Sequence, residues 1–553
     1  EVIRLCRLLE GMPLALELAA AWTPLLTCAE IAAEIERDLS FLRAAARNRP
    51  DRQRSLRAVF ESSWERLAPA EQAVLAKLAV FSGAFQRAAA IAVSGAALPE
   101  LLTLAGQSLL RRDAGGRYDM HELLRQYAAE KLAGDPASLA ETEVRHSRYY
   151  LGLLAAHQTA LQRNNQPQSL NAIGEAWENI QTAWQRALLH GDFELIGQAG
   201  PSLFLFCDTT SRFQAGETLL QTALDRLQPV AGQARRVAAL LAYQGRLLYN
   251  QGRYQTARDR LEQSLTLARQ EAALDLLAFA LHSLGLVAVM QGQYAQAKQL
   301  SRESLSLCRQ LGDAWGKAWA LYTLGWAAYY LGEYPAAQRL TQAGLHLHRR
   351  LGNRHGEAAC LNTLGLIVCG RYEYHLAQHP EAAAYFEQNL AIRRAIGERW
   401  GEATALHNLG YVHFKLGQYG PAQERFEASL ALAHLSGALN MQAATGMWLG
   451  VTAMEQADYA GAERQLRAAL KIASQHGALS RVTDTLYRLG DLWRRQGQVA
   501  EALACLTVVR AHPATDERVR EGVRLLLAEL VDQPSFPGPS RSLDDLVAQI
   551  LTQ

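Results

Sequence analysis

A leucine–glycine pair recurs along the second half of the chain at almost constant spacing. The Gln244–Gly245 pair fits one step earlier, so the steps are 40, 40, 40, 45, 40 and 40 residues. A fixed period of this length is typical of units that bury their apolar faces only against their neighbours. Residues 231–512 are therefore expected to form seven stacked units. The glycines of the six leucine–glycine pairs are Gly285, Gly325, Gly365, Gly410, Gly450 and Gly490.

Two further glycines in each unit predict where its helices end. A Gly-x-Tyr-x-x-Ala string follows the pair, as in Gly292, Tyr294 and Ala297, and another glycine, such as Gly312, closes the unit. Glycine adopts the left-handed conformation that ends many helices. The glycine of each pair is expected to let two helices approach closely. Each unit is thus predicted to be a pair of helices.

These strings resemble tetratricopeptide repeats, although each unit is six residues longer than the usual 34. The resemblance implies a right-handed α-solenoid. The fourth unit departs from the pattern, because it carries a five-residue insertion near residues 371–376 and has His379 where the other units have tyrosine. The expected fold is all-α, with one small β-hairpin in the N-terminal part.

The part before the repeats predicts further domains. Residues 1–48 read as helices, and six arginines fall within residues 43–57. Helical patterns then precede two short strands around Ala114, Gly115 and Gly116, which is the plan of a winged helix over residues 49–135. Residues 136–230 read as connecting helices, with Trp177 and Trp184 on one apolar face. Residues 513–553 read as capping helices and a tail.

Two short strings resemble the STAND signal-transduction ATPases. Residues 11–16 read GMPLAL, similar to the family's GLPLAL motif, and residues 118–122 read YDMHE, similar to its MHD motif with Glu122 in place of aspartate. The resemblance implies that Pro13 packs on the adenine of ADP and that His121 contacts its β-phosphate. It also implies that a repeat array senses an inducer and that the winged helix relays the signal to a nucleotide module.

The phosphate loop of such an ATPase is not present in this sequence. The nearest string, residues 312–318, has the wrong spacing and lacks the hydroxyl residue that binds Mg²⁺. We expect no catalysis and no cofactor in this chain, whereas a full-length parent is expected to use ADP and ATP with Mg²⁺. The chain begins at Glu1 within a helical pattern, so we interpret it as the C-terminal piece of a longer protein.

The best ligand candidates form an aromatic stripe on the first helix of one unit, at positions i, i+3, i+7, i+10 and i+11. The core of that helix is supplied by other residues, including Leu321 and Leu324, so the stripe is expected to line the concave groove. Aromatic and polar groups together suit a peptide, a protein segment or a small molecule. The predicted site residues are Trp319, Tyr322, Trp326, Tyr329, Tyr330, Arg246, Tyr249, Asn362, His407, Tyr411 and Phe414.

Other functions have weaker support in the sequence. The 56 basic and 54 acidic side chains nearly cancel, so no global field attracts nucleic acid or a membrane. A DNA-binding winged helix stays open as an alternative, but residues 98–109 carry no Lys or Arg. A plain protein-binding scaffold is the other alternative. We predict no membrane span, no metal site, seven free thiols and a cytoplasmic location.

Overall fold

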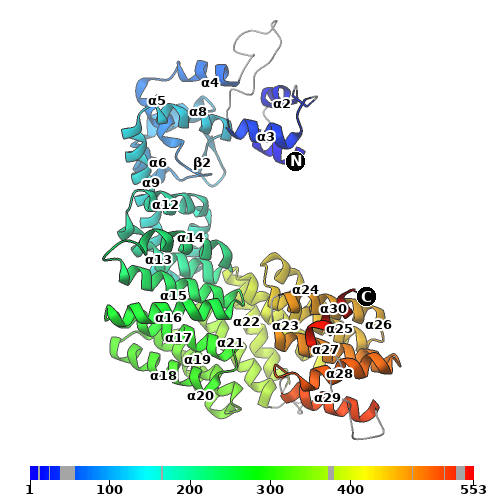
Figure 1. The fold of residues 1–553 in the computed structure, drawn as a ribbon. Helices are drawn as coiled ribbons and strands as arrows, with labels where there is room; N and C mark the ends of the chain where they lie inside the picture. Colours follow the sequence, from blue (N-terminus) through cyan, green and yellow to red (C-terminus); the bar gives the residue numbers. More distant parts are fainter. Residues whose placement is uncertain are drawn as a thin grey trace. The chain divides into compact units, whose positions relative to one another are not determined.

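The computed structural model describes the whole chain except residues 10–12, 21, 24, 38–55, 164–165, 372–378, 476–477, 516, 531–541 and 553. It forms two compact units (Figure 1). Unit 1 comprises residues 1–158 and 171–202, and unit 2 comprises residues 159–170 and 203–553. The described residues are helical apart from one two-stranded sheet and the connecting turns, which confirms the all-α prediction.

Unit 1 begins with short helices and contains the predicted hairpin. Strands β1 and β2 pair antiparallel, with Arg111 opposite Asp119 and Arg112 opposite Tyr118. The elements follow the order predicted for a winged helix, although the domain boundaries themselves stay predictions. Of the six arginines near residue 50, only Arg57 is described, and it pairs with Glu130 at 2.7 Å. The elements are α1 (Val2–Leu8), α2 (Pro13–Ala20), α3 (Cys28–Arg37), α4 (Leu56–Trp64), α5 (Pro69–Leu78), α6 (Arg87–Ser94), α7 (Leu98–Gly106), β1 (Arg111–Arg112), β2 (Tyr118–Asp119) and α8 (Glu122–Ala133).

Longer helices complete unit 1 and bury the apolar face that the sequence predicts. Trp177 and Trp184 of α12 are buried. The Asn179 side chain accepts a hydrogen bond of 2.8 Å from the Ser82 amide, which ties α12 to the segment after α5. The remaining helices up to the start of the repeats, some of them shared between the units, are α9 (Pro136–Ala156), α10 (Gln158–Gln162), α11 (Gln166–Glu175), α12 (Trp177–Leu189), α13 (Phe193–Thr209) and α14 (Phe213–Leu227).

Unit 2 contains seven consecutive helix pairs at the predicted positions (Figure 1). Each helix packs against the next along the chain, and most first helices also contact the first helix of the following pair, as α15 contacts α17. The predicted repeat array is confirmed. The pairs are α15 (Ala234–Asn250) with α16 (Tyr254–Gln270), α17 (Leu274–Met290) with α18 (Tyr294–Leu311), α19 (Ala314–Tyr330) with α20 (Tyr334–Leu351), α21 (Arg354–Arg371) with α22 (His379–Ile396), α23 (Arg399–Lys415) with α24 (Tyr419–Leu435), α25 (Leu439–Glu455) with α26 (Tyr459–Gln475), and α27 (Leu479–Arg495) with α28 (Val499–Ala511).

The glycines act as the sequence predicts. A Cβ atom at Gly450 would lie 2.7 Å from Leu466 Cγ of the paired helix, so only glycine permits this approach of α25 and α26. Gly312 ends α18 with φ +68°, a left-handed conformation that costs other residues about 1 kcal/mol or more. The insertion predicted near residues 371–376 lies outside the described residues except for residue 371.

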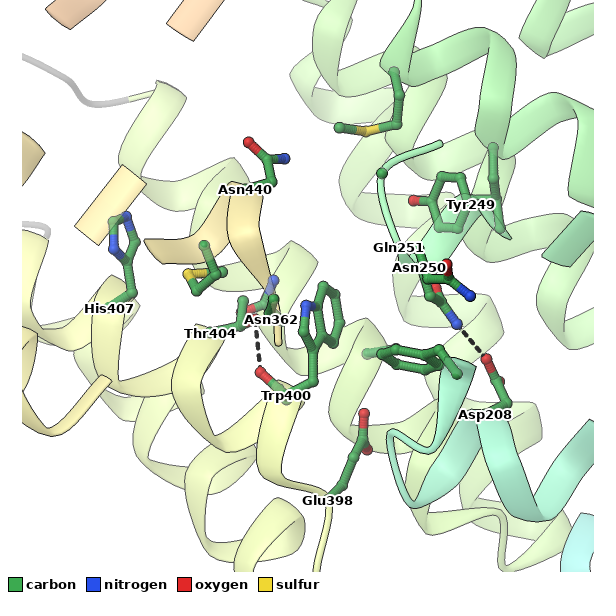
Figure 2. Close-up of a pocket in the computed structure, with 18 of the residues that line it drawn as sticks. Asp208, Tyr249, Asn250, Gln251, Asn362, Glu398, Trp400, Thr404, His407 and Asn440 are labelled. Atoms are coloured by element: carbon green, nitrogen blue, oxygen red, sulfur yellow. Dashed lines mark hydrogen bonds between the residues drawn. The ribbon is translucent and has the colours of Figure 1, made fainter. Parts of the chain in front are cut away.

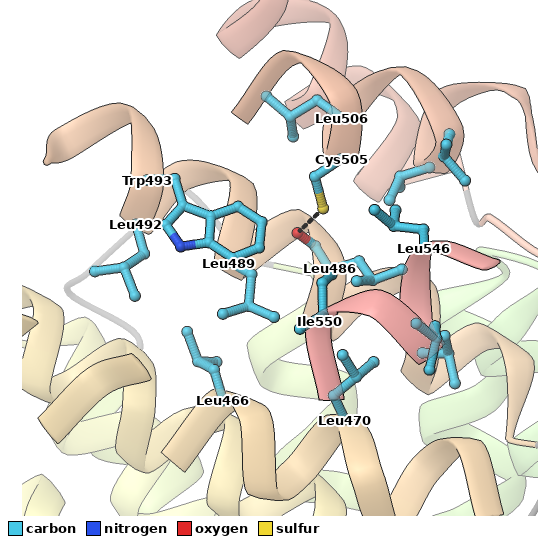
Figure 3. Packing of buried hydrophobic residues seen from close by; sticks show 14 of the residues in the cluster. Leu466, Leu470, Leu486, Leu489, Leu492, Trp493, Cys505, Leu506, Leu546 and Ile550 are labelled. Atoms are coloured by element: carbon cyan, nitrogen blue, oxygen red, sulfur yellow. Dashed lines mark hydrogen bonds between the residues drawn. The ribbon is translucent and has the colours of Figure 1, made fainter. Parts of the chain in front are cut away.

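Two helices close the C-terminal end of the array (Figure 3). They are α29 (Glu517–Leu530) and α30 (Leu543–Thr552), where the sequence predicts capping helices. Leu546 and Ile550 of α30 join Leu466, Leu486 and Cys505 of the last repeats in one buried cluster. The apolar ends of the last repeats are thus covered by helices from outside the repeat pattern.

No single described helix has the length and apolar composition needed to cross a membrane. Helices α6 and α7 meet those limits only when taken together, and the pair is bent by 112°. All seven cysteines are free, as predicted, and four of them are buried.

Candidate functional site

A cavity of about 260 Å³ opens inside unit 2, and we call it the central cavity. Its wall is formed mainly by the first helices of the repeats, α15, α17, α19, α21, α23 and α25, with contributions from the ends of α13 and α22. Tyr249 and Asn250 lie on one side of it, and Thr404 and His407 lie on the other (Figure 2). Segments that are more than 150 residues apart in the sequence therefore face a common space.

One wall of the central cavity is aromatic. Trp319 and Tyr322 meet edge to face with their ring centroids 5.4 Å apart, and Tyr322 meets Trp326 at 6.3 Å. Trp326 Nε1 donates a hydrogen bond of 2.6 Å to Thr363 Oγ1, which fixes the indole on the neighbouring repeat. Such edge-to-face pairs add about 0.5–1.5 kcal/mol beyond burial, so the wall is preorganised.

A buried ionic network forms the floor around the fourth repeat. The Glu398 carboxylate is 1% exposed and accepts hydrogen bonds from the Arg393 guanidinium. His355 Nδ1 lies 2.9 Å from the same carboxylate oxygen, and His355 Nε2 lies 3.6 Å from Asp208 Oδ2. The imidazole thus bridges two acidic side chains that come from different parts of unit 2.

The charges around Glu398 outweigh its burial. Desolvation alone would raise the pKa of this carboxyl, but the charges of Arg393 and His355 and their hydrogen bonds bring it below its ordinary value of 4.5. Desolvation, together with the charge of Arg481, lowers the pKa of His407 to about 3. Glu398 is therefore ionised and His407 is neutral at physiological pH.

A second polar chain leads from Asp208 to an arginine. Asn250 Nδ2 donates to Asp208 Oδ1 at 2.5 Å, and Arg246 Nη1 donates to Asn250 Oδ1 at 2.7 Å. The Arg246 guanidinium also lies over the Tyr249 ring, 4.9 Å from its centroid. The amide of Asn250 therefore lies between the Arg246 guanidinium and the Asp208 carboxylate.

Asparagines carry the network across the cavity. Arg393 Nε donates to Asn389 Oδ1 at 3.1 Å, and Asn389 Nδ2 donates to Asn362 Oδ1 at 3.3 Å. Asn408 Nδ2 donates to the same Asn362 oxygen at 2.8 Å. Within the described residues, Asn362 Nδ2 and Asn408 Oδ1 have no protein partner, which leaves one donor and one acceptor at the cavity.

The structure brings seven of the eleven predicted groove residues to the central cavity. They are Arg246, Tyr249, Trp319, Tyr322, Trp326, Asn362 and His407. Tyr329 and Tyr330 leave the stripe: Tyr330 is 42% exposed and stacks on Tyr294 at 5.0 Å, whereas Tyr329 packs beside Tyr334. Tyr411 and Phe414 pack instead on Trp448, with centroid distances of 4.9 and 5.3 Å.

The two residues of the predicted partial ADP site lie in unit 1. Pro13 begins α2, and His121 caps α8, where its Nδ1 accepts a hydrogen bond of 3.2 Å from the Leu123 amide. No group of three or more His, Cys, Asp or Glu residues within the described ranges is arranged to hold a metal ion.

Sequence reasoning missed the ionic and polar residues of the floor, namely Asp208, His355, Asn389, Arg393 and Glu398. A signal for one of them exists. The position that holds Arg393 is alanine in three other repeats, at Ala268, Ala433 and Ala473, and all of these side chains are buried. An arginine in a small buried position indicates a charge held inside the array.

A smaller cavity adjoins the first one and shares Asp208, Arg246, Trp319 and His355 with it. Leu161 and Gln166, from the segment 159–170 that unit 2 takes from the N-terminal half, complete its wall. Gln166 Oε1 accepts hydrogen bonds from the amides of Arg354 and His355 at 3.0 and 3.3 Å. This segment therefore caps the first turn of α21 beside the ionic network.

Comparison with known proteins supports the repeat assignment. Residues 276–347, 369–433 and 484–514 match families described as tetratricopeptide repeat. These segments are tetratricopeptide repeats.

A protein of Mycobacterium tuberculosis, named provisionally as an HTH-type transcriptional regulator, is 34% identical over 194 residues, which is 33% of this chain and 22% of that protein. An uncharacterized protein of the same organism is 34% identical over 140 residues, 23% of this chain and 36% of that protein. The chain thus matches only about a fifth to a third of the length of these relatives.

Two solved structures resemble the chain at low sequence identity. The chain resembles a STAND protein with a tetratricopeptide repeat sensor from Pyrococcus horikoshii, with a TM-score of 0.49, 14% identity, and coverage of 93% of this chain and 71% of that one. It also resembles a Rap protein crystallised with competence and sporulation factor, with a TM-score of 0.47, 13% identity, and coverage of 68% of this chain and 99% of that one.

Proposed function

We propose that unit 2 is a sensor whose central cavity binds a short peptide inducer. The observation that carries the proposal is the pairing of an aromatic wall with the free donor of Asn362 and the free acceptor of Asn408. One donor and one acceptor side by side match the C=O and N–H of a peptide unit, and aromatic rings accommodate its side chains. A cavity of this size lined by several repeats suits a short segment better than a folded partner.

The proposal extends to a signalling role in a longer protein. The GMPLAL and YDMHE strings support a parent of the STAND class in which inducer binding biases an ADP/ATP switch. The described residues alone do not fit a nucleotide. His121 is buried, its Nδ1 already caps α8, and the sequence contains no phosphate loop. The phosphate-binding groups would have to come from elsewhere in the parent.

Cavity filling tests the binding proposal. Thr404 lines the central cavity between Trp400 and His407, so Thr404→Trp should occupy the space of a ligand (Figure 2). Thr266→Trp adds the same side chain at an exposed position of α16 and serves as the control. A pool of linear peptides of about five to eight residues is equilibrated with the full chain, and retained peptides are identified by mass spectrometry.

We expect the wild-type chain and Thr266→Trp to retain the same peptides, and Thr404→Trp to bind them at least about tenfold more weakly, a change of about 1.4 kcal/mol. Equal retention by Thr404→Trp, or no retention by the wild type, would contradict the proposal. In the full-length parent, a retained peptide should change the rate of nucleotide exchange. An unchanged rate would reject the switch and leave the binding site in place.

A further inference from the structure

Arg246 is a buried cation without a carboxylate partner of its own. It is 7% exposed, and its one polar contact among the described residues is the hydrogen bond to Asn250 Oδ1. Arg393 is similarly buried at 4% but has Glu398 beside it. A buried charge normally requires a partner of opposite sign, because the loss of hydration costs several kcal/mol. Unlike Arg393, Arg246 is therefore a buried charge in the wall of the central cavity that lacks an ion-pair partner within the described part of the chain.

Other groups of the same wall are also donors without acceptors. Trp319 Nε1, Gln251 Nε2 and Arg481 Nε are buried and have no hydrogen-bond partner, and all three residues line the central cavity. Trp319 is only 4% exposed and contacts both cavities together with Arg246. No buried acceptor among the described lining residues lacks a partner. Among these fully buried atoms the unpaired groups are therefore all donors, although the wall also holds the free acceptor of Asn408.

We propose that the ligand of the central cavity carries a carboxylate and that this group pairs with Arg246. This inference rests on the proposed peptide-binding function and specifies the class of peptide. The free edge of a guanidinium can hold a carboxylate through two parallel hydrogen bonds. Asn250 and the Tyr249 ring hold the guanidinium in place, so it needs little ordering when the ligand arrives.

Arg246 is a better anchor than Arg481, another arginine of the wall, whose buried Nε donor has no described partner. Arg481 already has Asp484 at 3.7 Å, and its side chain is 30% exposed, so its charge is partly compensated and partly hydrated. Asp208 and Glu398 lie on the cavity as well, but Asp208 is engaged by Asn250 and His355, and Glu398 is engaged by Arg393 and His355. An acidic ligand group is thus attracted to the Arg246 side of the cavity.

The carboxylate can be the C-terminus of a peptide or an acidic side chain, and the experiment separates the two. The full chain is equilibrated with two pools of random pentapeptides that differ only in ending with a carboxylate or a carboxamide. Each retained peptide is then synthesised in matched forms, with the C-terminal acid changed to the amide and with each Asp or Glu changed to Asn or Gln. Dissociation constants are measured by isothermal titration calorimetry.

We expect neutralisation of one carboxylate to weaken binding to the wild type at least about tenfold. In Arg246→Gln the acid and neutral forms should bind equally, whereas Arg246→Lys should keep part of the difference. Arg302→Gln, which removes an exposed charge from α18, should behave as the wild type. Circular dichroism of each variant establishes that the array is folded.

Two results would overturn the inference alone: retained peptides that bind equally well after every carboxylate is neutralised, or a full acid preference that survives in Arg246→Gln. Retention of no peptide from either pool would reject the peptide-binding function and this inference together. Loss of the difference only when the C-terminus is amidated identifies the terminal carboxylate as the group that is bound. Loss only on changing an Asp or Glu identifies the side chain.

Discussion

The fourth and sixth repeats share one backbone plan but differ in what they bury. Arg393 of α22 and Glu398 after it occupy the positions that Ala473 and Ala478 hold 80 residues later. In the sixth repeat these positions are small, and α26 packs tightly against its neighbours and against α30. In the fourth repeat the larger polar side chains reach the central cavity.

This difference separates the apolar C-terminal repeats, which stabilise the array, from the repeats of the proposed binding site. The C-terminal repeats form a continuous apolar cluster covered by α29 and α30 (Figure 3). The fourth repeat has a buried ion pair where the sixth repeat has alanines. The free energy lost on desolvating Arg393 and Glu398 offsets most of the attraction between their charges. One repeat with little net stabilisation from its own core can stay folded, because the interfaces with the repeats on both sides stabilise it.

The largest effect is expected from breaking the buried ion pair. Arg393→Ala leaves the Glu398 carboxylate buried without its main partner, which should destabilise unit 2 by about 3–5 kcal/mol. The double change Arg393→Ala with Glu398→Ala gives the fourth repeat the residues of the sixth. It should be clearly more stable than Arg393→Ala alone, because the Glu398 carboxylate is no longer left buried without its arginine.

Urea unfolding followed by tryptophan fluorescence measures this comparison. If the double variant is no more stable than Arg393→Ala, the charge pair is not the feature that distinguishes the two repeats. Both variants should also lose peptide binding in the central cavity, since Arg393 positions Asn389 and, through it, Asn362.

The second effect concerns the apolar end of the array. Leu486 is fully buried in the C-terminal cluster, so Leu486→Ala should destabilise unit 2 by about 2–5 kcal/mol through lost contacts and a new cavity. Leu525→Ala, at a side chain that is 52% exposed in α29, should change stability by less than about 0.5 kcal/mol. Peptide affinity of the folded Leu486→Ala chain should be unchanged. This result would show that packing of the C-terminal cluster and the proposed peptide binding are independent. Weaker binding by this variant would show that they are coupled.

The sequence predicted the repeats well because their signals are local. Gly312 at the left-handed end of α18 and Gly450, where α25 contacts α26, are each required within a single repeat. The spacing of such glycines alone therefore predicts the helix pairs. The groove face of α19 was predicted only in part. Helical periodicity places Tyr329 and Tyr330 in the stripe. At the C-terminal end of α19, however, their side chains pack on Tyr334 and Tyr294 instead.

The ionic floor was not predictable in the same way. His355 contacts Asp208, which lies 147 residues earlier in the chain, and Gln166 contacts the start of α21 from an even greater sequence distance. Such pairs depend on how the repeats curve around the cavity, and no local pattern encodes that curvature. Arg393, which stands where three other repeats have alanine, was the local sequence signal that indicated the ionic floor.

A pH change should affect the cavity half of the array. Desolvation lowers the pKa of His282, His348 and His407 to about 3, whereas an unfolded histidine has a pKa of about 6.5. Below pH 6.5 the unfolded chain therefore binds protons that the folded chain does not, and stability falls as the pH decreases. Between pH 7 and 5 each of these histidines should remove up to about 2 kcal/mol. Glu398 has a lowered pKa, so its contribution is kept across this window and is lost only at more acidic pH.

Urea midpoints at pH 7 and 5 measure this loss, and His407→Asn should reduce it. The C-terminal cluster contains no histidine, so Leu486→Ala should show the same pH dependence as the wild type. If His407→Asn loses as much stability on acidification as the wild type does, the buried neutral imidazole is not responsible.

The smallest expected effect is at Gln166, which links the N-terminal half of the sequence to the fourth repeat. Gln166→Ala removes the acceptor from the amides of Arg354 and His355, which should cost about 1 kcal/mol. These two amides should exchange hydrogen faster, while the first amides of α25, which have no such cap, should be unaffected. Gln168→Ala, two residues away and exposed, should leave both rates unchanged. Unaltered exchange at Arg354 and His355 in Gln166→Ala would show that the helix end is satisfied without the segment 159–170. The fourth repeat would then owe its polar character to the ionic network alone.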